Sequence, residues 1–186
     1  MECKSGQKQY TIWYPWDENG YKPEVFFTLG VCENGFTMHI KTKETEPKRE
    51  AKAHLEPVHV DSCVEWFVNF LPESCDRYFN FEVNAGGIMY AAFRKDRYDY
   101  KVLELKDIES LNIQATIQEN SWEINYTVPF ELIKKYIPDY RYTNKIRANF
   151  YKCGSQTEYP HYGVFQHPGT LKPDFHRPEC FVEILL

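Results

Sequence analysis

The chain has 186 residues, which suits one domain over residues 1–186 with a substantial buried core. Its formal net charge is −5 and its basic residues are dispersed, which argues against a surface that binds the phosphate backbone of nucleic acids. No apolar run approaches the roughly 18 residues of a membrane-spanning helix, so we expect neither a nucleic acid nor a membrane as partner. Aromatic residues make up 17% of the chain, and aromatic side chains favour strands.

The N-terminal residues lack the apolar stretch of a signal peptide. The sequence as written therefore predicts a cytoplasmic protein, although a secreted protein whose leader had been removed would read the same way. The cysteines form no CxxC pair and no zinc-ribbon spacing, so we expect free thiols buried as small hydrophobic side chains rather than disulfides. They are Cys3, Cys32, Cys63, Cys75, Cys153 and Cys180.

In chain order, strand-like runs alternate with turn residues. The first hairpin is the clearest, because Asn34 and Gly35 supply a turn between Val25–Val31 and Phe36–Lys41. The charged stretch Lys41–Lys52 has no large apolar residue and predicts a solvated loop. The later predicted strands are Cys63–Leu71, Tyr78–Asn84, Ile88–Phe93, Asn112–Gln118, Trp122–Val128, Ile146–Lys152 and Cys180–Leu186.

Phe130–Ile137 is the one predicted helix, because Pro129 suits a first helical turn and Pro138 closes the segment. About nine or ten strands with hairpin connections, and no repeating strand–helix–strand pattern, indicate an all-β fold. We therefore expect an antiparallel β-sandwich with jelly-roll or immunoglobulin-like layers and one short helix.

Alternation along these strands separates an apolar face from a polar one. Val64 and Trp66, for example, point to one face of their strand and Glu65 points to the other. Carboxylate, amide and guanidinium groups on such a face can hydrogen-bond a polar ligand. The polar strand faces therefore supply candidate ligand-binding residues. They include Glu65, Glu82, Arg147, Asn149 and Tyr151.

Three parts of the chain carry recognisable motifs: Val60–Phe67 with Tyr78–Asn84, then Val128–Leu132, and last Arg147–Tyr151 with Lys172–Glu179. Together they resemble the family 9 carbohydrate-binding modules, which share a sandwich fold with the wider DOMON-like group. Val60–Phe67 and Tyr78–Asn84 are similar to that family's Asp-Ser-x-Val-Glu strand and its Phe-Glu-Val-Asn partner. Val128–Leu132 resembles its Ile-Pro-Trp/Phe-x-x-Leu element. Arg147–Tyr151 and Lys172–Glu179 are similar to its Arg-x-Asn-Phe-Tyr strand and its Pro-Asp-Phe-His-x-Pro closing segment.

The resemblance implies a non-catalytic module, linked to glycan degradation, that binds the end of an oligosaccharide or polysaccharide chain. The implied ligand is a glucan or xylan end held between two aromatic rings, often in a protein with structural calcium. His59 stands at the position of the first ring, and Phe165 or, alternatively, Tyr162 at that of the second. Arg94 corresponds to an arginine that follows the family's central hairpin.

Two other functions stay open at this level. Paired carboxylates also suit a small glycan-active enzyme, in which their separation decides the chemistry. DOMON-like sandwiches include haem or redox domains, which need an axial Met or His pair facing a pocket. The metal content is equally open: Asp17–Gly20 begins like a calcium loop, but a turn is the simpler interpretation.

Overall fold

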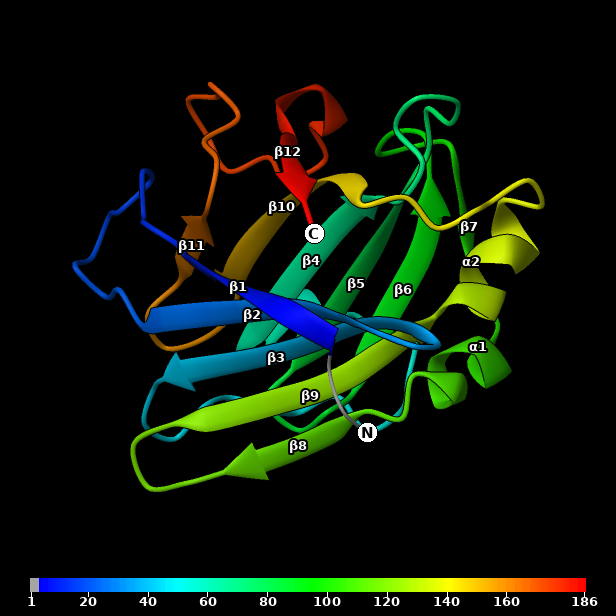
Figure 1. Ribbon diagram of the computed structural model, residues 1–186. Coiled ribbons are helices and arrows are strands. Elements are labelled where there is room, and N and C mark those ends of the chain that lie inside the picture. The colour runs from blue at the N-terminus through cyan, green and yellow to red at the C-terminus, as the bar shows by residue number, and fades with distance from the viewer. Residues whose placement is uncertain (1–3) are drawn as a thin grey trace.

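The protein is a sandwich of two antiparallel sheets, as the computed structural model of residues 4–186 shows (Figure 1). Sheet A has the strand order β1 (Lys4–Thr11), β2 (Glu24–Cys32), β3 (Gly35–Lys43), β9 (Trp122–Pro129) and β8 (Gln114–Ile117). Sheet B has the order β11 (His161–Val164), β10 (Lys145–Gly154), β4 (Cys63–Asn69), β5 (Tyr78–Asn84), β6 (Met89–Arg94) and β7 (Tyr100–Val102). A further strand, β12 (Val182–Leu185), pairs with β10 at the edge it shares with β11.

The main core fills the space between the sheets and follows the predicted alternation. From sheet B it receives Trp66 and Phe81, which are fully buried and stack at 5.8 Å between ring centroids. From sheet A it receives Phe27, whose ring lies 5.0 Å from that of Phe150 on β10. The all-β sandwich predicted from the sequence is confirmed.

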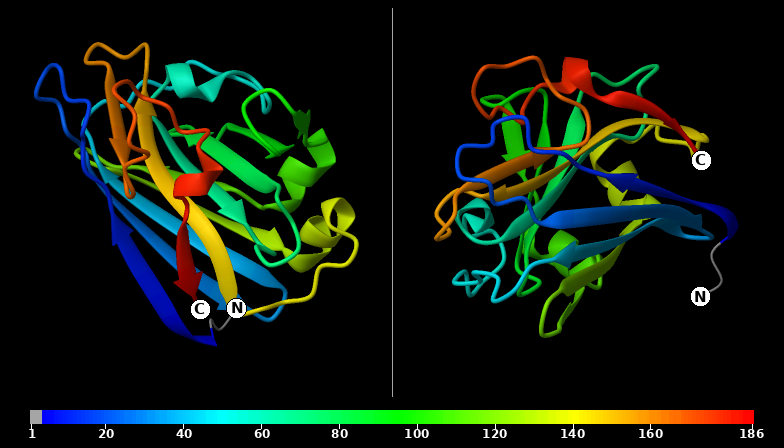
Figure 2. Two further views of the ribbon diagram at one scale, coloured as in Figure 1. Left: turned by 90° about the horizontal axis from the view of Figure 1, so that it is seen from above. Right: turned by 90° about the vertical axis from the view of Figure 1, so that its left-hand side faces the viewer.

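A second apolar layer covers the outer face of sheet B, which the sequence did not predict. It forms because two connecting segments fold over that face: the one containing η1 (Val58–Val60), and the one from residue 165 to η2 (Pro178–Cys180), coloured orange to red in Figure 2. We call this the outer layer. It consists of Val58, Cys63, Phe67, Tyr78, Tyr151, Cys153, Val164, Phe175 and Phe181.

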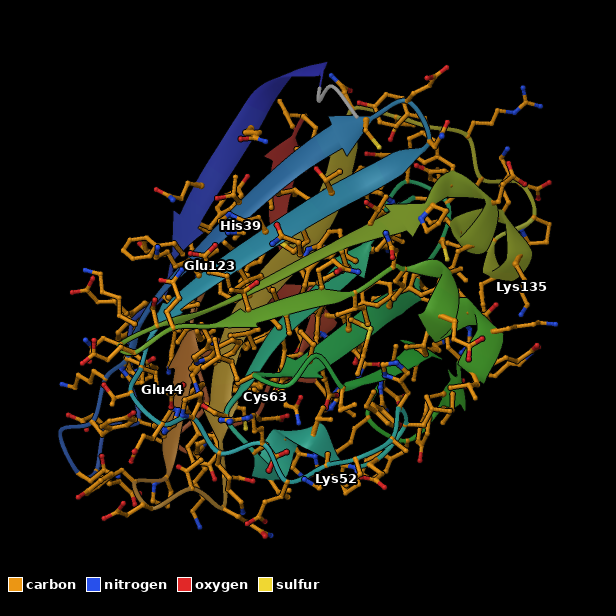
Figure 3. The ribbon with its side chains drawn as sticks, turned by 90° about the horizontal axis from the view of Figure 1, so that it is seen from below. His39, Glu44, Lys52, Cys63, Glu123 and Lys135 are labelled. Carbon is orange, nitrogen blue, oxygen red and sulfur yellow. The ribbon has the colours of Figure 1, made fainter. Side chains whose placement is uncertain are left out.

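The outer face of sheet A is polar instead. On it Glu123 pairs with His39 at 3.0 Å and with Lys41 at 2.9 Å. Figure 3 shows Glu123 and His39 side by side. The two outer faces of the sandwich therefore differ in character: among the described residues, an apolar cover lies on that of sheet B.

The short elements are where prediction and structure differ. The expected helix is α2 (Phe130–Tyr136), but residues 4–186 contain a second short helix, α1 (Leu105–Ser110), stabilised by a capping box between Glu104 and Asp107. Strands β1, β7 and β11 were also not predicted. β1 is polar, and β7 and β11 have three and four residues, so none shows a clear period-2 pattern.

No helix within residues 4–186 has the length and apolar character needed to cross a membrane. The five described cysteines are free thiols; Cys32, Cys63 and Cys153 are buried, and Cys75 and Cys180 are partly exposed. Cys3 lies outside the described residues.

Candidate functional site

A hollow of about 380 Å³ opens on the outer face of sheet B, beside the outer layer. This size is in the range of small-molecule sites, about 300–1,000 Å³. Five predicted residues line it, namely His59, Glu65, Glu82, Arg94 and Tyr162. It is also lined by Pro57, Tyr90, Arg97, Cys153, Ser155, Pro173, Phe175 and His176. Two other hollows are larger: one is more open and polar and has no buried carboxyl, and in the other the one buried carboxyl, that of Glu44, is paired with Lys152.

Strand register places the floor of the hollow. Glu65 on β4 lies directly opposite Glu82 on β5, and Glu82 lies opposite Tyr90 on β6. Directly opposed residues of antiparallel strands have Cβ atoms about 4.5–5.5 Å apart and point to the same face. The pairing therefore aligns two carboxyls and a phenol in one row across three strands.

The two carboxyls of this row are 3% and 6% exposed, so their charges are costly. Burial raises the pKa of Glu65 well above its usual range, and the neighbouring Glu82 raises it further. Burial also raises the pKa of Glu82 to about 7, against the opposing effects of Arg94 and of the Asn80 amide, which donates to Glu82 Oε1 at 2.6 Å. The pair therefore holds its protons to a higher pH than exposed carboxyls do, and in its protonated form it offers both a donor and acceptors to a ligand.

This titration gives a stability prediction. The unfolded chain releases the Glu82 proton near pH 4.5, while the folded chain holds it to about pH 7, so ionisation of Glu82 destabilises the fold progressively across that interval. Glu82→Gln will raise the free energy of unfolding at pH 8 by about 3 kcal/mol and leave it unchanged near pH 4. Chemical denaturation at the two pH values measures the difference.

Glu123→Gln is the matched control, because hydrogen bonds from Lys41 and then His39 lower the pKa of Glu123. The Glu123 carboxylate stabilises the fold above pH 4.5, so Glu123→Gln will lower the free energy of unfolding at pH 8, whereas Glu82→Gln raises it. If Glu82→Gln changes the free energy of unfolding equally at pH 4 and pH 8, the pKa of Glu82 is not raised in the folded protein.

Arg94 borders the row with its guanidinium fixed on several sides. Its Nε donates to Asn80 Oδ1 at 2.8 Å, its Nη1 to the carbonyl of Arg97 at 3.2 Å, and its Nη2 to the Tyr90 hydroxyl at 3.4 Å. The guanidinium also lies 4.2 Å from the centre of the Tyr100 ring. A guanidinium has five N–H groups, so two are left for a ligand in a fixed orientation.

Aromatic rings also line the hollow. Phe175 stacks on the buried Tyr151 at 4.3 Å and 18°, and its centroid is 6.4 Å from that of the half-buried Tyr162. His59 is exposed at the rim, and its carbonyl accepts from the Ser155 amide at 3.1 Å and hydroxyl at 2.9 Å. Burial lowers the pKa of His59, so its ring is largely neutral at pH 7.

The C-terminal segment that lines the hollow, with Phe175 and His176, is attached to sheet B by further contacts. His176 lies over Phe67 at 5.0 Å between ring centroids, and its Nδ1 is 3.0 Å from the Tyr78 hydroxyl. Burial, and then the charges of Arg94 and Arg97, lower the pKa of His176 to about 3, which keeps the ring neutral. Arg97 also forms an ion pair with Asp174. This segment is therefore anchored before any ligand arrives.

These features fit the family match. A family model for carbohydrate-binding family 9 matches residues 4–186. The chain belongs to carbohydrate-binding family 9. Comparison with curated proteins finds no match.

Among solved structures, the family 9 chain is similar to a proposed carbohydrate-binding protein from Bacteroides uniformis ATCC 8492, with 25% identity and a TM-score of 0.85 over 96% of this chain and 86% of that one. It also shares its fold with a family 9 module from Caldicellulosiruptor kristjanssonii. The complex of that module with cellotriose has 9% identity and a TM-score of 0.65 over 96% and 82% of the two chains. Its complex with glucose has 10% identity and a TM-score of 0.61 over 90% and 78%.

The structure places four predicted site residues outside the hollow. Arg147 donates to the carbonyls of Glu179 and Phe181, and lines a different hollow. Asn149 is fully buried and pairs with the backbone N–H and C=O of Gln166 at 2.9 and 2.8 Å. Both side chains therefore hold the C-terminal segment rather than face a ligand.

The other two are aromatic. Tyr151 is fully buried beneath Phe175, and its hydroxyl donates to the carbonyl of that residue at 3.0 Å. Phe165 packs on the main core, with ring centroids 5.2 Å from Tyr10 and 5.8 Å from Phe150. Of the two rings proposed for the second wall, Tyr162 lines the hollow and Phe165 does not.

Some of the remaining lining residues could have been predicted from the sequence, and others could not. Tyr90 shares its strand face with Arg94, so the alternation used for Glu65 would also have found it. Phe175 and His176 lie inside the closing segment that carries the family resemblance. Arg97 follows β6 in a loop, and no periodic pattern marks it.

The loop Asp17–Gly20, which begins like a calcium loop, forms the turn that was the simpler interpretation. Asp17 Oδ1 accepts the amide of Gly20 at 2.7 Å, and its Oδ2 pairs with Lys22 at 2.7 Å, so the loop is an Asx-type turn. In the described part of the chain no group of three or more His, Cys, Asp or Glu side chains gathers to hold a metal. Structural calcium stays a prediction that rests on the resemblance.

Proposed function

We propose that the hollow on sheet B binds the end of an oligosaccharide or polysaccharide chain, and that this family 9 protein is a non-catalytic module linked to glycan degradation. One observation carries the proposal: Glu65, Glu82 and Arg94 converge with the rings of Tyr162 and Phe175 around one hollow. The choice of a chain end, rather than the middle of a chain, rests on the resemblance to the family 9 modules.

The chemistry of the lining suits a pyranose. The ring of Tyr162 offers a face for the sugar's C–H groups, while the carboxyl pair and Arg94 reach its hydroxyls. The carboxyl pair supplies donor and acceptor together, which matches hydroxyls that both donate and accept. Since Asn80, Tyr90 and Arg97 already fix Arg94, little side-chain freedom is lost on binding.

The two alternatives receive less support from the site. Glycosidases place their two carboxyls on either side of the scissile bond. Glu65 and Glu82 instead project side by side from neighbouring strands, so both meet a ligand from one side. For a haem domain, Met38 and Met89 are buried in the main core, and His176 is engaged with Tyr78.

A pair of single variants tests the position of the site. Tyr162→Ala will weaken sugar binding about tenfold, because a stacking ring contributes about 0.5–1.5 kcal/mol beyond its area. Phe165→Ala will leave the affinity unchanged, since its ring lies in the main core. Calorimetry with glucose, cellotriose and xylotriose measures both.

The reverse result, with Phe165→Ala weakening binding and Tyr162→Ala neutral, would move the site away from the hollow. A folded wild-type protein that binds none of these sugars at millimolar concentration would overturn the proposed function.

A further inference from the structure

A group of aromatic side chains continues from the Phe175 wall along the outer surface, and the proposed site does not use it. It consists of Trp13 and Trp16, from the segment between β1 and β2, and His167, from the segment after β11; we call it the aromatic shelf. Trp13 is 51% exposed, although tryptophan is usually well buried. Large apolar side chains gathered at a surface mark binding sites.

The shelf lies on the same face as the hollow. Trp13 pairs with Val164 through reciprocal backbone hydrogen bonds of 3.0 and 2.9 Å, so it extends the row Val164, Tyr151 and Glu65 across sheet B. Directly paired residues point to one face, and three strand spacings separate Trp13 from Glu65, about 14 Å. This distance leaves room for more than one sugar residue.

The rings between these two points form an unbroken series. Phe175 lines the hollow, and its centroid is 6.2 Å from that of Trp16. Trp16 lies 5.1 Å from His167, which lies 5.6 Å from Trp13. Each ring therefore contacts the next, from the wall of the hollow to the exposed indole.

The shelf is also rigid. Trp13 Nε1 donates to the carbonyl of Phe165 at 3.3 Å, and Trp16 Nε1 donates to that of Thr170 at 2.9 Å. Both bonds attach the indoles to the segment that also carries His167, whose Nδ1 accepts the amide of Gly169 at 3.1 Å. Rings held in place lose little entropy when a ligand stacks on them.

We propose that the aromatic shelf binds the sugar residues that follow the one held in the hollow, so that the protein recognises an oligosaccharide rather than a single chain-end sugar. This inference rests on the proposed function, because the shelf is continuous with that hollow. A sugar chain is the occupant that fits, since its successive C–H faces stack on successive rings.

The test compares ligands of increasing length by calorimetry: glucose, cellotriose and cellohexaose, and the matching xylose series. The wild type will bind the hexasaccharide about tenfold more tightly than the monosaccharide, as one or two added stacking contacts allow. Trp13→Ala will remove most of that gain and leave monosaccharide affinity unchanged, and Trp13→Phe will restore part of it. Tyr142→Ala is the control, because Tyr142 is similarly exposed at 47% but packs on Phe36 and Phe130 beside α2.

Each result has a definite meaning. Binding of the monosaccharide with no gain for the longer sugars, or a gain that survives Trp13→Ala, would overturn the shelf and leave the hollow intact. No binding of any sugar by the wild type would overturn the proposed function and, with it, the shelf. Self-association of the wild type that Trp13→Ala abolishes, without an effect of ligand length, would assign the shelf to a second copy of the chain.

Discussion

Replacing Glu65 with alanine will weaken sugar binding at least about a hundredfold, which corresponds to about 3 kcal/mol lost from two hydrogen bonds whose sugar partners stay unsatisfied. Glu65 lies in the centre of the floor, between Tyr151 and Glu82 in the cross-strand row. Within residues 4–186 no group donates a hydrogen bond to its carboxyl, so its hydrogen-bonding capacity is free for a ligand. The same fact means that its removal leaves no buried partner unpaired in the protein.

Glu65→Gln separates the shape of this side chain from its proton. Burial and the neighbouring Glu82 raise the pKa of Glu65 well above its usual range, which favours the protonated carboxyl, and an amide offers a similar donor and acceptor. We therefore expect Glu65→Gln to stay within about tenfold of the wild type. Calorimetry gives the affinities, and melting temperatures close to that of the wild type show that both variants are folded. Wild-type affinity in Glu65→Ala would remove Glu65 from the site.

Replacing Lys152 with methionine will destabilise the protein by about 3–5 kcal/mol, the usual cost of breaking a buried ion pair from one side. The Lys152 side chain is fully buried, and its Nζ lies 3.4 Å from Glu44 Oε2, 2.9 Å from Ser62 Oγ and 2.7 Å from His161 Nε2. Burial and then Lys152 lower the pKa of His161 to about 4, so the neutral ring accepts the ammonium's hydrogen. Glu44 is labelled in Figure 3, at the end of the sandwich where β3 finishes.

The cost arises mainly at Glu44. Burial raises the pKa of this carboxyl, but Lys152, and hydrogen bonds from Ser62 and Trp122, lower it by more, so the ionised group stabilises the fold above pH 4.5. Without Lys152 the pKa of Glu44 in the folded protein will rise. The stability lost in Lys152→Met will therefore be smaller at lower pH, where Glu44 takes up a proton. Urea denaturation at pH 7 and pH 4.5 measures this difference.

Two further variants control for lost packing. Lys145→Met, on the same strand, removes only exposed pairs with Glu73 and Glu183 and will cost less than about 1 kcal/mol. The double variant Lys152→Met with Glu44→Leu will recover much of the loss, because no buried charge remains unpaired. A double variant as unstable as Lys152→Met alone would show that packing, not charge, explains the effect.

The sandwich and part of the site follow from local patterns in the amino-acid sequence. Alternation in β4 and β5 assigned Trp66 and Phe81 to the core and Glu65 and Glu82 to the other face, because a strand's side chains point in turn to opposite faces. The closing segment with Phe175 and His176 was visible as a family-like motif, although its ring was not identified as a wall of the hollow.

Which polar strand residues line the hollow depends instead on the packing of distant segments. Asn149 and Tyr151 share the outer face of sheet B with Glu65, yet the segment after β11 covers both and uses their hydrogen bonds for itself. Alternation tells which face a side chain is on, but not which part of that face a distant segment covers. The same folding of the chain brings Trp16 against Phe175, a contact between residues more than a hundred positions apart. Such contacts depend on where loops cross a sheet, and no local pattern in the sequence records that.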